Sequence, residues 1–135
     1  MLKEILFDAT RLPLLAKGLD AYALRHRAIS DNIANSETVG YNRRVIEFEE
    51  RLRLAKGAGG LQRTHEGHLG SGGVDPTSLD PHVVTDADKS DINDLNNVDI
   101  DREMADLAEN HLQFNFASRL AKLYFELIQS SIRGA

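Results

Sequence analysis

The chain has 135 residues, enough for one domain of ordinary size rather than two independent cores. With 41% hydrophobic and 27% charged residues and no cysteine, it is neither a disordered tail nor a disulfide-stapled or thiolate metal protein. The net charge of −5 arises in residues 74–101, where eight acidic residues face one basic residue, so the basic surface of a nucleic-acid-binding protein is not expected.

The first element is a helix predicted from Leu12 to Asn35. Its apolar positions are spaced alternately three and four residues apart, as in a helix that pairs with another. These seam positions are Leu12, Leu15, Leu19, Tyr22, His26, Ile29 and Ile33. Pro13 falls in the first turn, where its missing N–H costs nothing. The helix is expected to end at Asn35, Ser36, Thr38 and Gly40.

The middle of the chain, residues 42–98, changes character. Seven of the ten glycines lie between Gly57 and Gly73, and an acidic stretch with two prolines follows. We expect a flexible segment with short extended pieces at 45–48 and 81–85. Two accounts of the apolar helix surfaces remain open: this segment folds back and covers them, or other chains do. Its composition favours other chains, and therefore oligomerisation or polymerisation.

The second helix is predicted to span residues 99–133, with Asp99 as its N-cap. Its seam consists of Ile100, Met104, Leu107, His111, Phe114, Ser118, Ala121, Phe125, Ile128 and Ile132, and a second apolar row of Leu112, Phe116, Leu120, Leu123 and Leu127. A helix that is apolar on so much of its surface must be covered on more than one side. The fold expected is mainly α, with the two terminal helices pairing as an antiparallel, coiled-coil-like hairpin. Its domain organisation is an N-terminal helix (1–41), a middle segment (42–98) and a C-terminal helix (99–135).

No catalytic, cofactor-binding or metal-binding residues are predicted. His65 and His68 are three residues apart among glycines, which does not match a zinc-binding helix. Asp86, Asp88, Asp91 and Asp94 lack the glycine and glutamate of a calcium loop. His26 and His111 are interpreted as packed residues at a helix interface, close together if the helices pair. An enzyme is therefore not expected.

One motif is more specific. Asn32-Ile33-Ala34-Asn35-Ser36-Glu37-Thr38-Val39-Gly40-Tyr41 resembles the N-I-A-N-x-x-T-P-G-Y signature of bacterial flagellar rod and hook proteins. The matching signature residues are Asn32, Ile33, Ala34, Asn35, Thr38, Gly40 and Tyr41. Val39 departs from the usual proline. If this segment is a rigid joint, Gly40 should adopt a positive φ.

The other end of the chain carries a second resemblance. Residues 96–104 and the L-A-E-N-H-L-Q-F that follows are similar to the C-terminal helix of a proximal rod protein in that family. The short length favours a proximal rod protein over the longer distal rod and hook proteins, with a second short rod protein as the nearest alternative.

The resemblance implies a structural subunit of the proximal flagellar rod that polymerises helically through its terminal helices and transmits torque. The implied partners are copies of itself, other rod and basal-body proteins and the flagellar type III export apparatus, with no nucleic acid, small-molecule substrate or cofactor. The implied location is the basal-body rod in the periplasmic space. The first 30 residues lack a signal-peptide pattern, so export without a cleaved signal is expected. A helical adaptor or export chaperone is the alternative function.

Overall fold

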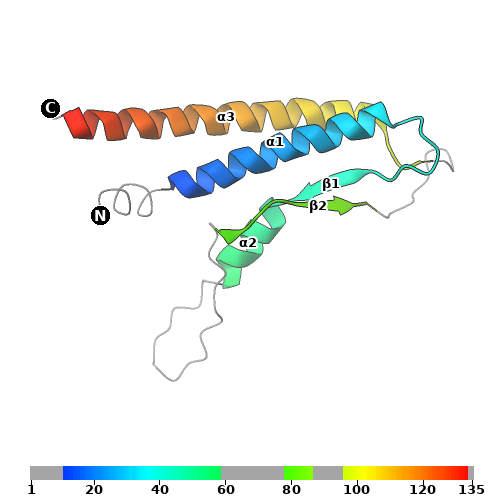
Figure 1. Ribbon diagram of the computed structural model, residues 1–135, viewed down its shortest axis with the longest axis horizontal. Coiled ribbons are helices and arrows are strands. Elements are labelled where there is room, and N and C mark those ends of the chain that lie inside the picture. Colours follow the sequence, from blue (N-terminus) through cyan, green and yellow to red (C-terminus); the bar gives the residue numbers. More distant parts are fainter. Residues whose placement is uncertain (1–10, 59–77, 87–95, 134–135) are drawn as a thin grey trace, which may run out of the picture.

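The computed structural model describes residues 11–58, 78–86 and 96–133. Two long helices lie side by side, and a small sheet with a shorter helix lies beside the first of them (Figure 1). The elements in chain order are α1 (Leu12–Ala34), β1 (Arg44–Glu47), α2 (Glu49–Ala58), β2 (His82–Thr85) and α3 (Ile100–Arg133). The predicted fold, mainly α with paired terminal helices, is confirmed.

The two long helices run antiparallel (Figure 1). Asn32, near the end of α1, contacts Glu103 near the start of α3, whereas Tyr22, further back on α1, contacts Asn110. α1 begins at Leu12 as predicted and ends one residue early, with Asn35 as its C-cap. Within the described ranges, none of the helices combines the length and apolar character that a membrane span requires.

The predicted N-cap of α3 is confirmed. Asp99 Oδ1 accepts hydrogen bonds from the backbone N–H groups of Asp101 at 3.0 Å and Arg102 at 3.3 Å. Because the first N–H groups of a helix have no partner within it, this carboxylate satisfies two of them and fixes where the helix starts. Asp101 and Glu103 in the first turn and Arg133 in the last complement the helix dipole.

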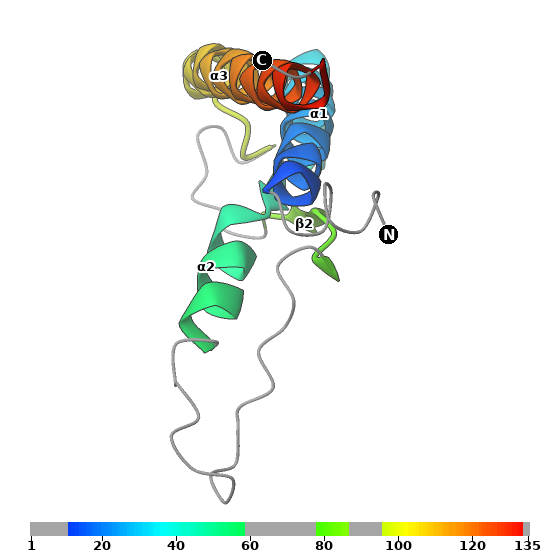
Figure 2. The ribbon, with the colours of Figure 1, turned by 90° about the vertical axis from the view of Figure 1, so that its left-hand side faces the viewer.

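Both predicted extended pieces are strands. β1 and β2 pair antiparallel, with Arg44 opposite Thr85 and Glu47 opposite His82. The sequence did not predict that they pair with each other, nor that α2 follows β1. Figure 2 shows α2 extending away from the two long helices, below them in this view. Gly57 lies in α2, whereas residues 59–77 of the Gly-rich stretch, and Asp88, Asp91 and Asp94, lie outside the described residues.

Part of the middle segment folds back onto α1, whereas the cover of the apolar rows on α3 by other chains stays a prediction. Ala21 and Ala28 of α1 form a buried cluster with Ile46 of β1 and Phe48, and Leu24 and Leu52 pack against it. The small side chains on α1 allow the strand to approach closely. Burying a side chain such as Phe48 stabilises the fold by roughly 1.5–3 kcal/mol.

The buried face of α3 differs from both apolar rows. Its buried residues, Glu103, Asn110 and Ala117, are seven residues apart, and two of the three are polar. Seam positions Ile100 and Met104 are 47% and 53% exposed. The fold therefore places polar groups at the helix interface and leaves much of the apolar surface of α3 open.

Candidate functional site: a buried polar joint

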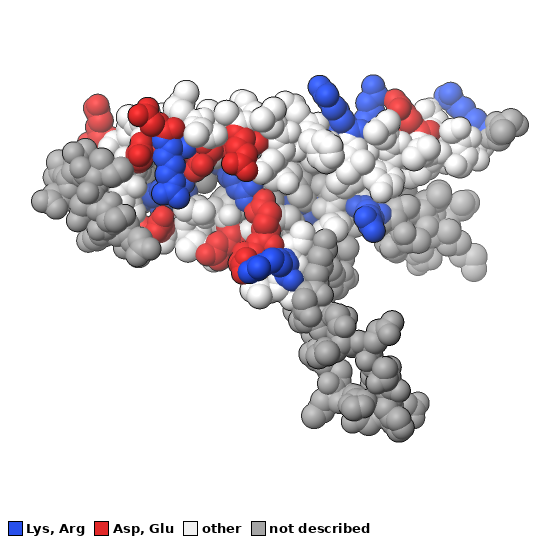
Figure 3. Space-filling view, turned by 180° about the vertical axis from the view of Figure 1, so that it is seen from behind, with Lys and Arg blue, Asp and Glu red and all other residues white. Residues whose placement is uncertain are grey.

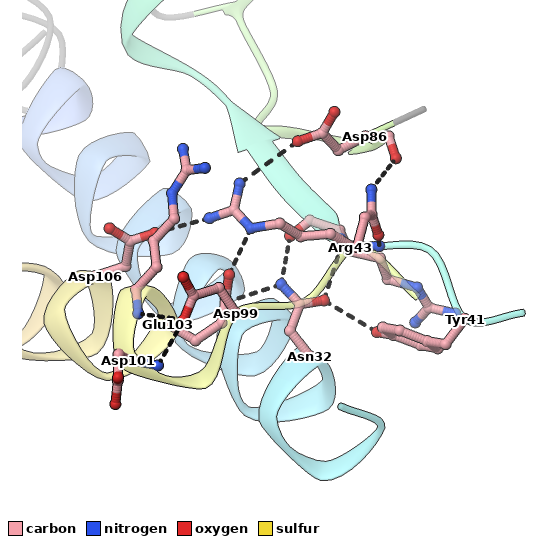
Figure 4. A network of polar contacts seen from close by, with 11 residues as sticks. Asn32, Tyr41, Arg43, Asp86, Asp99, Asp101, Glu103 and Asp106 are labelled. Carbon is pink, nitrogen blue, oxygen red and sulfur yellow. Dashed lines mark hydrogen bonds and ion pairs between the residues drawn. The ribbon is translucent and has the colours of Figure 1, made fainter. Parts of the chain in front are cut away.

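Asn32 is the centre of a polar network that links α1, β1 and α3 (Figure 4). Its side chain is completely buried. Nδ2 donates to the carbonyl of Arg44 at 2.9 Å and to Glu103 Oε2 at 3.0 Å. Oδ1 accepts from the N–H of Arg44 at 2.9 Å and from the Tyr41 hydroxyl at 3.0 Å. The amide thus makes the four hydrogen bonds it can make and pairs with β1 as another strand would.

Arg43 supplies the positive charge of the network. Its Nε donates to Glu103 Oε1, and its Nη2 donates to Asp106 Oδ2 at 2.7 Å. Nη1 lies 3.7 Å from Asp86 Oδ2, so the guanidinium faces three carboxylates (Figure 4). Burial opposes the charge of Arg43, but the hydrogen bond to Glu103 and the three nearby carboxylates outweigh it and raise the pKa of Arg43. The cation and the buried Glu103 carboxylate therefore stabilise each other.

Asn97 connects the segment before α3 to the sheet. Its Oδ1 accepts from the backbone N–H of Arg43 at 2.7 Å, and its Nδ2 donates to the carbonyl of Asp86 at 2.9 Å. The N–H of Asp86 donates in turn to the carbonyl of Arg43 at 2.8 Å. One carboxamide therefore bridges the backbone of Arg43, just before β1, and that of Asp86, just after β2. We call Asn32, Tyr41, Arg43, Asn97 and Glu103, with Asp86 and Asp106, the polar joint.

The turn after α1 brings Tyr41 back to the helix. The N–H of Thr38 donates to the carbonyl of Asn35 at 2.9 Å, and the N–H of Tyr41 donates to the carbonyl of Thr38 at 3.2 Å. Gly40 has φ +77°, the positive value expected for a rigid joint. Burial raises the pKa of the Tyr41 hydroxyl, which therefore stays a donor to Asn32 far above neutral pH.

The signature residues have distinct placements. Asn32, Asn35, Thr38, Gly40 and Tyr41 form the network and its turn. Asn35 also donates from Nδ2 to the carbonyl of Asp31 at 2.8 Å. Ile33 is half-buried and Ala34 is exposed. Their assignment as a functional signature stays a prediction.

The predicted packing and assembly positions divide between buried and exposed surfaces. Leu12 and Ile29 are buried; Leu15, Leu19, Tyr22, Ile33, Leu107 and Leu120 are half-buried; Ile100, Met104, Leu112, Phe114, Phe116, Leu123 and Leu127 are exposed. Four of the five residues in the second row of α3 are thus open, and Leu112 and Phe116 are 72% and 71% exposed. Their role in assembly stays a prediction.

The two seam histidines meet as expected. The rings of His26 and His111 stack with centroids 5.1 Å apart and an interplanar angle of 21°, although both residues are exposed. Among residues 11–58, 78–86 and 96–133, no three His, Asp or Glu side chains are grouped as metal ligands would be. His65 and His68 lie outside the described residues.

A cleft of about 400 Å³ lies beside the joint, between α1, β1 and α3. Its charged lining residues are largely paired: Arg25 donates to Glu49, and Arg43 is held by the joint. Asn110 donates from Nδ2 to the carbonyl of Tyr22 at 3.0 Å, while its Oδ1 has no hydrogen-bond partner among the described residues. The described residues that line the cleft include no serine, threonine or histidine.

Comparison with known proteins gives a consistent result. No protein-family profile matches the chain. It is 34% identical over 116 residues to the flagellar basal body rod protein FlgB of Borreliella burgdorferi, covering 82% of this chain and 86% of that protein. The chain belongs to the FlgB family of flagellar basal body rod proteins. FlgB of Yersinia enterocolitica is 32% identical over 105 residues, with 73% of this chain and 75% of that protein covered. FlgB of Bacillus subtilis is 28% identical over 109 residues, 81% of each chain.

The resemblance seen in the sequence is therefore confirmed, and the polar joint gives it a physical basis. Asn32 and Tyr41 come from the motif that closes α1, whereas Asn97 and Glu103 come from the motif that opens α3. The two motifs are about 60 residues apart in the sequence but hydrogen-bond to each other in the fold. Sequence reasoning used them as family markers and did not predict their contact. The informative signal was the presence of asparagine and glutamate next to apolar seam positions.

Proposed function

We propose that this protein is a structural, non-enzymatic subunit of the proximal flagellar rod that polymerises helically through α1 and α3 and transmits torque. Membership of the FlgB family supports the rod assignment. The observation that carries the polymerisation proposal is the open apolar row on α3, where Leu112, Phe116, Leu123 and Leu127 are 55–72% exposed. Monomeric proteins rarely leave so long an apolar patch in water.

Copies of the chain and other rod and basal-body proteins are the proposed partners. The row on α3 has the spacing of a helix-packing seam, since Phe116, Leu120, Leu123 and Leu127 follow one another at four, three and four residues. A neighbouring helix can therefore cover it along its length. Burying each Leu or Phe is worth roughly 1.5–3 kcal/mol, and a polymer repeats that gain at every subunit.

The polar joint supports a role in transmitting force between elements of the subunit. Its hydrogen bonds connect α1, the sheet and the start of α3, so a force on one element reaches the others through groups whose positions are fixed. The polar side chains of the joint hydrogen-bond to one another and to the backbone, whereas in an enzyme such groups would face a substrate. From the family we further propose a location in the rod across the periplasm, reached by the flagellar type III export apparatus without a cleaved signal.

The test is an aspartate in the open row. Leu123→Asp or Leu120→Asp should abolish rod assembly and motility while the protein is still made, exported and folded. Asn115→Asp, which introduces the same charge at an exposed position on the same helix outside the row, is the control and should assemble normally. Circular dichroism checks folding, and swimming assays and basal-body preparations check assembly. Normal swimming in both leucine variants would contradict the proposal.

A concentration series separates this proposal from an adaptor or export chaperone. A rod subunit should form progressively larger species with itself or with other basal-body proteins as its concentration rises. A chaperone should instead stay at a fixed size and bind a client at a defined stoichiometry. Analytical ultracentrifugation of the purified chain, alone and with candidate rod proteins, distinguishes the two.

A further inference from the structure

The two ends of the helix pair carry opposite charge. The joint end, residues 31–44 and 96–109, has seven acidic and three basic residues, a formal charge of −4. The free end, where α1 begins and α3 finishes, consists of residues 11–20 and 119–133 and has five basic and two acidic residues, a formal charge of +3. Residues 110–118 between them on α3 carry no Asp, Glu, Lys or Arg. Figure 3 shows the acidic residues gathered toward one end of the molecule and basic residues projecting at the other.

Helix dipoles do not explain this pattern. On α3, acidic residues at the start and basic residues at the end complement the dipole of the helix itself. α1 runs antiparallel to α3, and its charges do not complement its own dipole. Its first turn contains no acidic residue, and its last turn contains no basic residue. Arg11 instead precedes α1, while Asp31 and Glu37 lie at its end. The side-chain charges of both helices are therefore negative at the joint end and positive at the free end, although the dipoles of the two antiparallel helices oppose each other.

Both ends also expose apolar side chains. At the joint end Ile100 and Met104 are about half exposed, and at the free end Phe125 and Ile132, which lie outside the open row, are 54% and 70% exposed. Specific interfaces commonly combine an apolar centre with a charged rim, and complementary charge fixes which surfaces meet. Each end has these features, with opposite signs of charge.

We propose that the free end of one copy docks onto the joint end of the next copy. The occupant of each acidic end is thus the basic end of a second copy of this chain. Because the two surfaces differ, the contact is heterologous, and a heterologous contact that does not close into a ring produces an open filament. This inference rests on the proposed function and specifies the subunit contact that runs along the length of the molecule.

Charge reversal at each end tests the contact. The first variant combines Arg119→Glu with Arg133→Glu, and the second combines Glu37→Lys with Asp101→Lys; all four side chains are exposed. Each variant alone should self-associate at least tenfold more weakly than the parent chain in sedimentation velocity at low salt. A mixture should form a 1:1 complex with the parental affinity, because the first variant retains an acidic end and the second a basic end.

Controls separate this contact from the lateral row on α3. The Arg27→Glu variant changes an exposed residue midway along α1 and should self-associate like the parent chain. Self-association of the parent chain should weaken as the salt concentration rises from roughly 0.05 to 0.5 M, because salt screens the attraction between surface charges over this range. Parental self-association by either reversed variant alone, or no complex in the mixture, overturns the proposal. If those results occur while Leu123→Asp still abolishes assembly, end-to-end docking is wrong and the rod function stands.

Discussion

The joint end and the free end of the same helix pair are built in opposite ways. At the joint end, buried polar groups from α1, β1 and α3 meet one another, and the Asn32 side chain satisfies its whole hydrogen-bonding capacity. At the free end, apolar side chains such as Phe125 and Ile132 face water. The first arrangement specifies one geometry within the monomer, whereas the second leaves surface for another chain. Stability and assembly should therefore respond to mutations at different ends.

The largest effect is expected from Glu103→Ala. This change removes the fully buried carboxylate to which Arg43 Nε and Asn32 Nδ2 both donate, so that Arg43 keeps only the partly exposed carboxylates of Asp106 and Asp86. Breaking a buried ion pair costs about 3–5 kcal/mol of unfolding free energy. Glu109→Ala, an exposed glutamate on the same helix, is the matched control and should change stability by less than about 0.5 kcal/mol. Urea unfolding followed by circular dichroism measures both. A loss below 1 kcal/mol in Glu103→Ala would show that the joint does not hold the helices together.

A smaller loss is expected from Gly40→Val. At φ +77° a side chain with a Cβ costs of order 1–2 kcal/mol, although no atom lies within 4 Å of where that Cβ would stand. The cost is therefore backbone strain alone. Val39→Pro restores the residue usual in rod and hook proteins and should be neutral. Thermal unfolding compares the Gly40→Val and Val39→Pro variants. Equal melting temperatures for the two variants would show that a side chain at position 40 causes no backbone strain.

Tyr41→Phe removes one hydrogen bond to Asn32 and should cost about 0.5–1.5 kcal/mol at neutral pH. Because burial raises the pKa of Tyr41, the folded chain keeps the proton at pH values where the unfolded chain, with a pKa near 10.0, releases it. The contribution of the Tyr41 hydroxyl to the unfolding free energy is therefore complete below the unfolded-state pKa. It is lost as the pH rises through the higher pKa of the folded state. The difference between parent and variant should therefore shrink in alkali. A constant difference from pH 7 to 11 contradicts this assignment.

The smallest effect on the monomer is expected at the free end. Leu127→Ala truncates a side chain that is 65% exposed, so the unfolding free energy should change by less than about 0.5 kcal/mol. Self-association should nevertheless weaken, because the same side chain belongs to the open row. Unfolding and sedimentation experiments on one preparation compare the two quantities. A large loss of stability would mean that the free end is part of the monomer core.

Apolar periodicity predicted both long helices within a residue or two of their ends, and Asp99 could be identified as a cap from its position alone. The same method could not find the joint. It assigns polar residues to the outside, and Glu103 and Asn110 occupy inside positions because partners distant in sequence satisfy them. Whether such partners exist depends on the tertiary fold and not on the local pattern.

α2 was missed for a related reason. Its first half carries Glu49, Glu50, Arg51 and Arg53, a run of charges that the sequence pattern assigns to a solvated surface. Leu52 of α2 packs against the buried cluster on α1, and Phe48, the residue before α2, belongs to that cluster. Two apolar contacts are too few to produce a helical period, and the pairing of β1 with β2 across an intervening 34 residues left no local signal either.

The sequence separations within the polar joint also determine when the chain can fold. Asn32 and Glu103 are 71 residues apart, and Arg43 is 60 residues from Glu103. A growing chain that has not yet reached α3 therefore contains Asn32 and Arg43 without the carboxylate that satisfies them, and the entropy of closing the long loop is not yet compensated. Docking of the two helices must be a late event that needs nearly the whole chain. A fragment ending before residue 96 should show no cooperative unfolding transition.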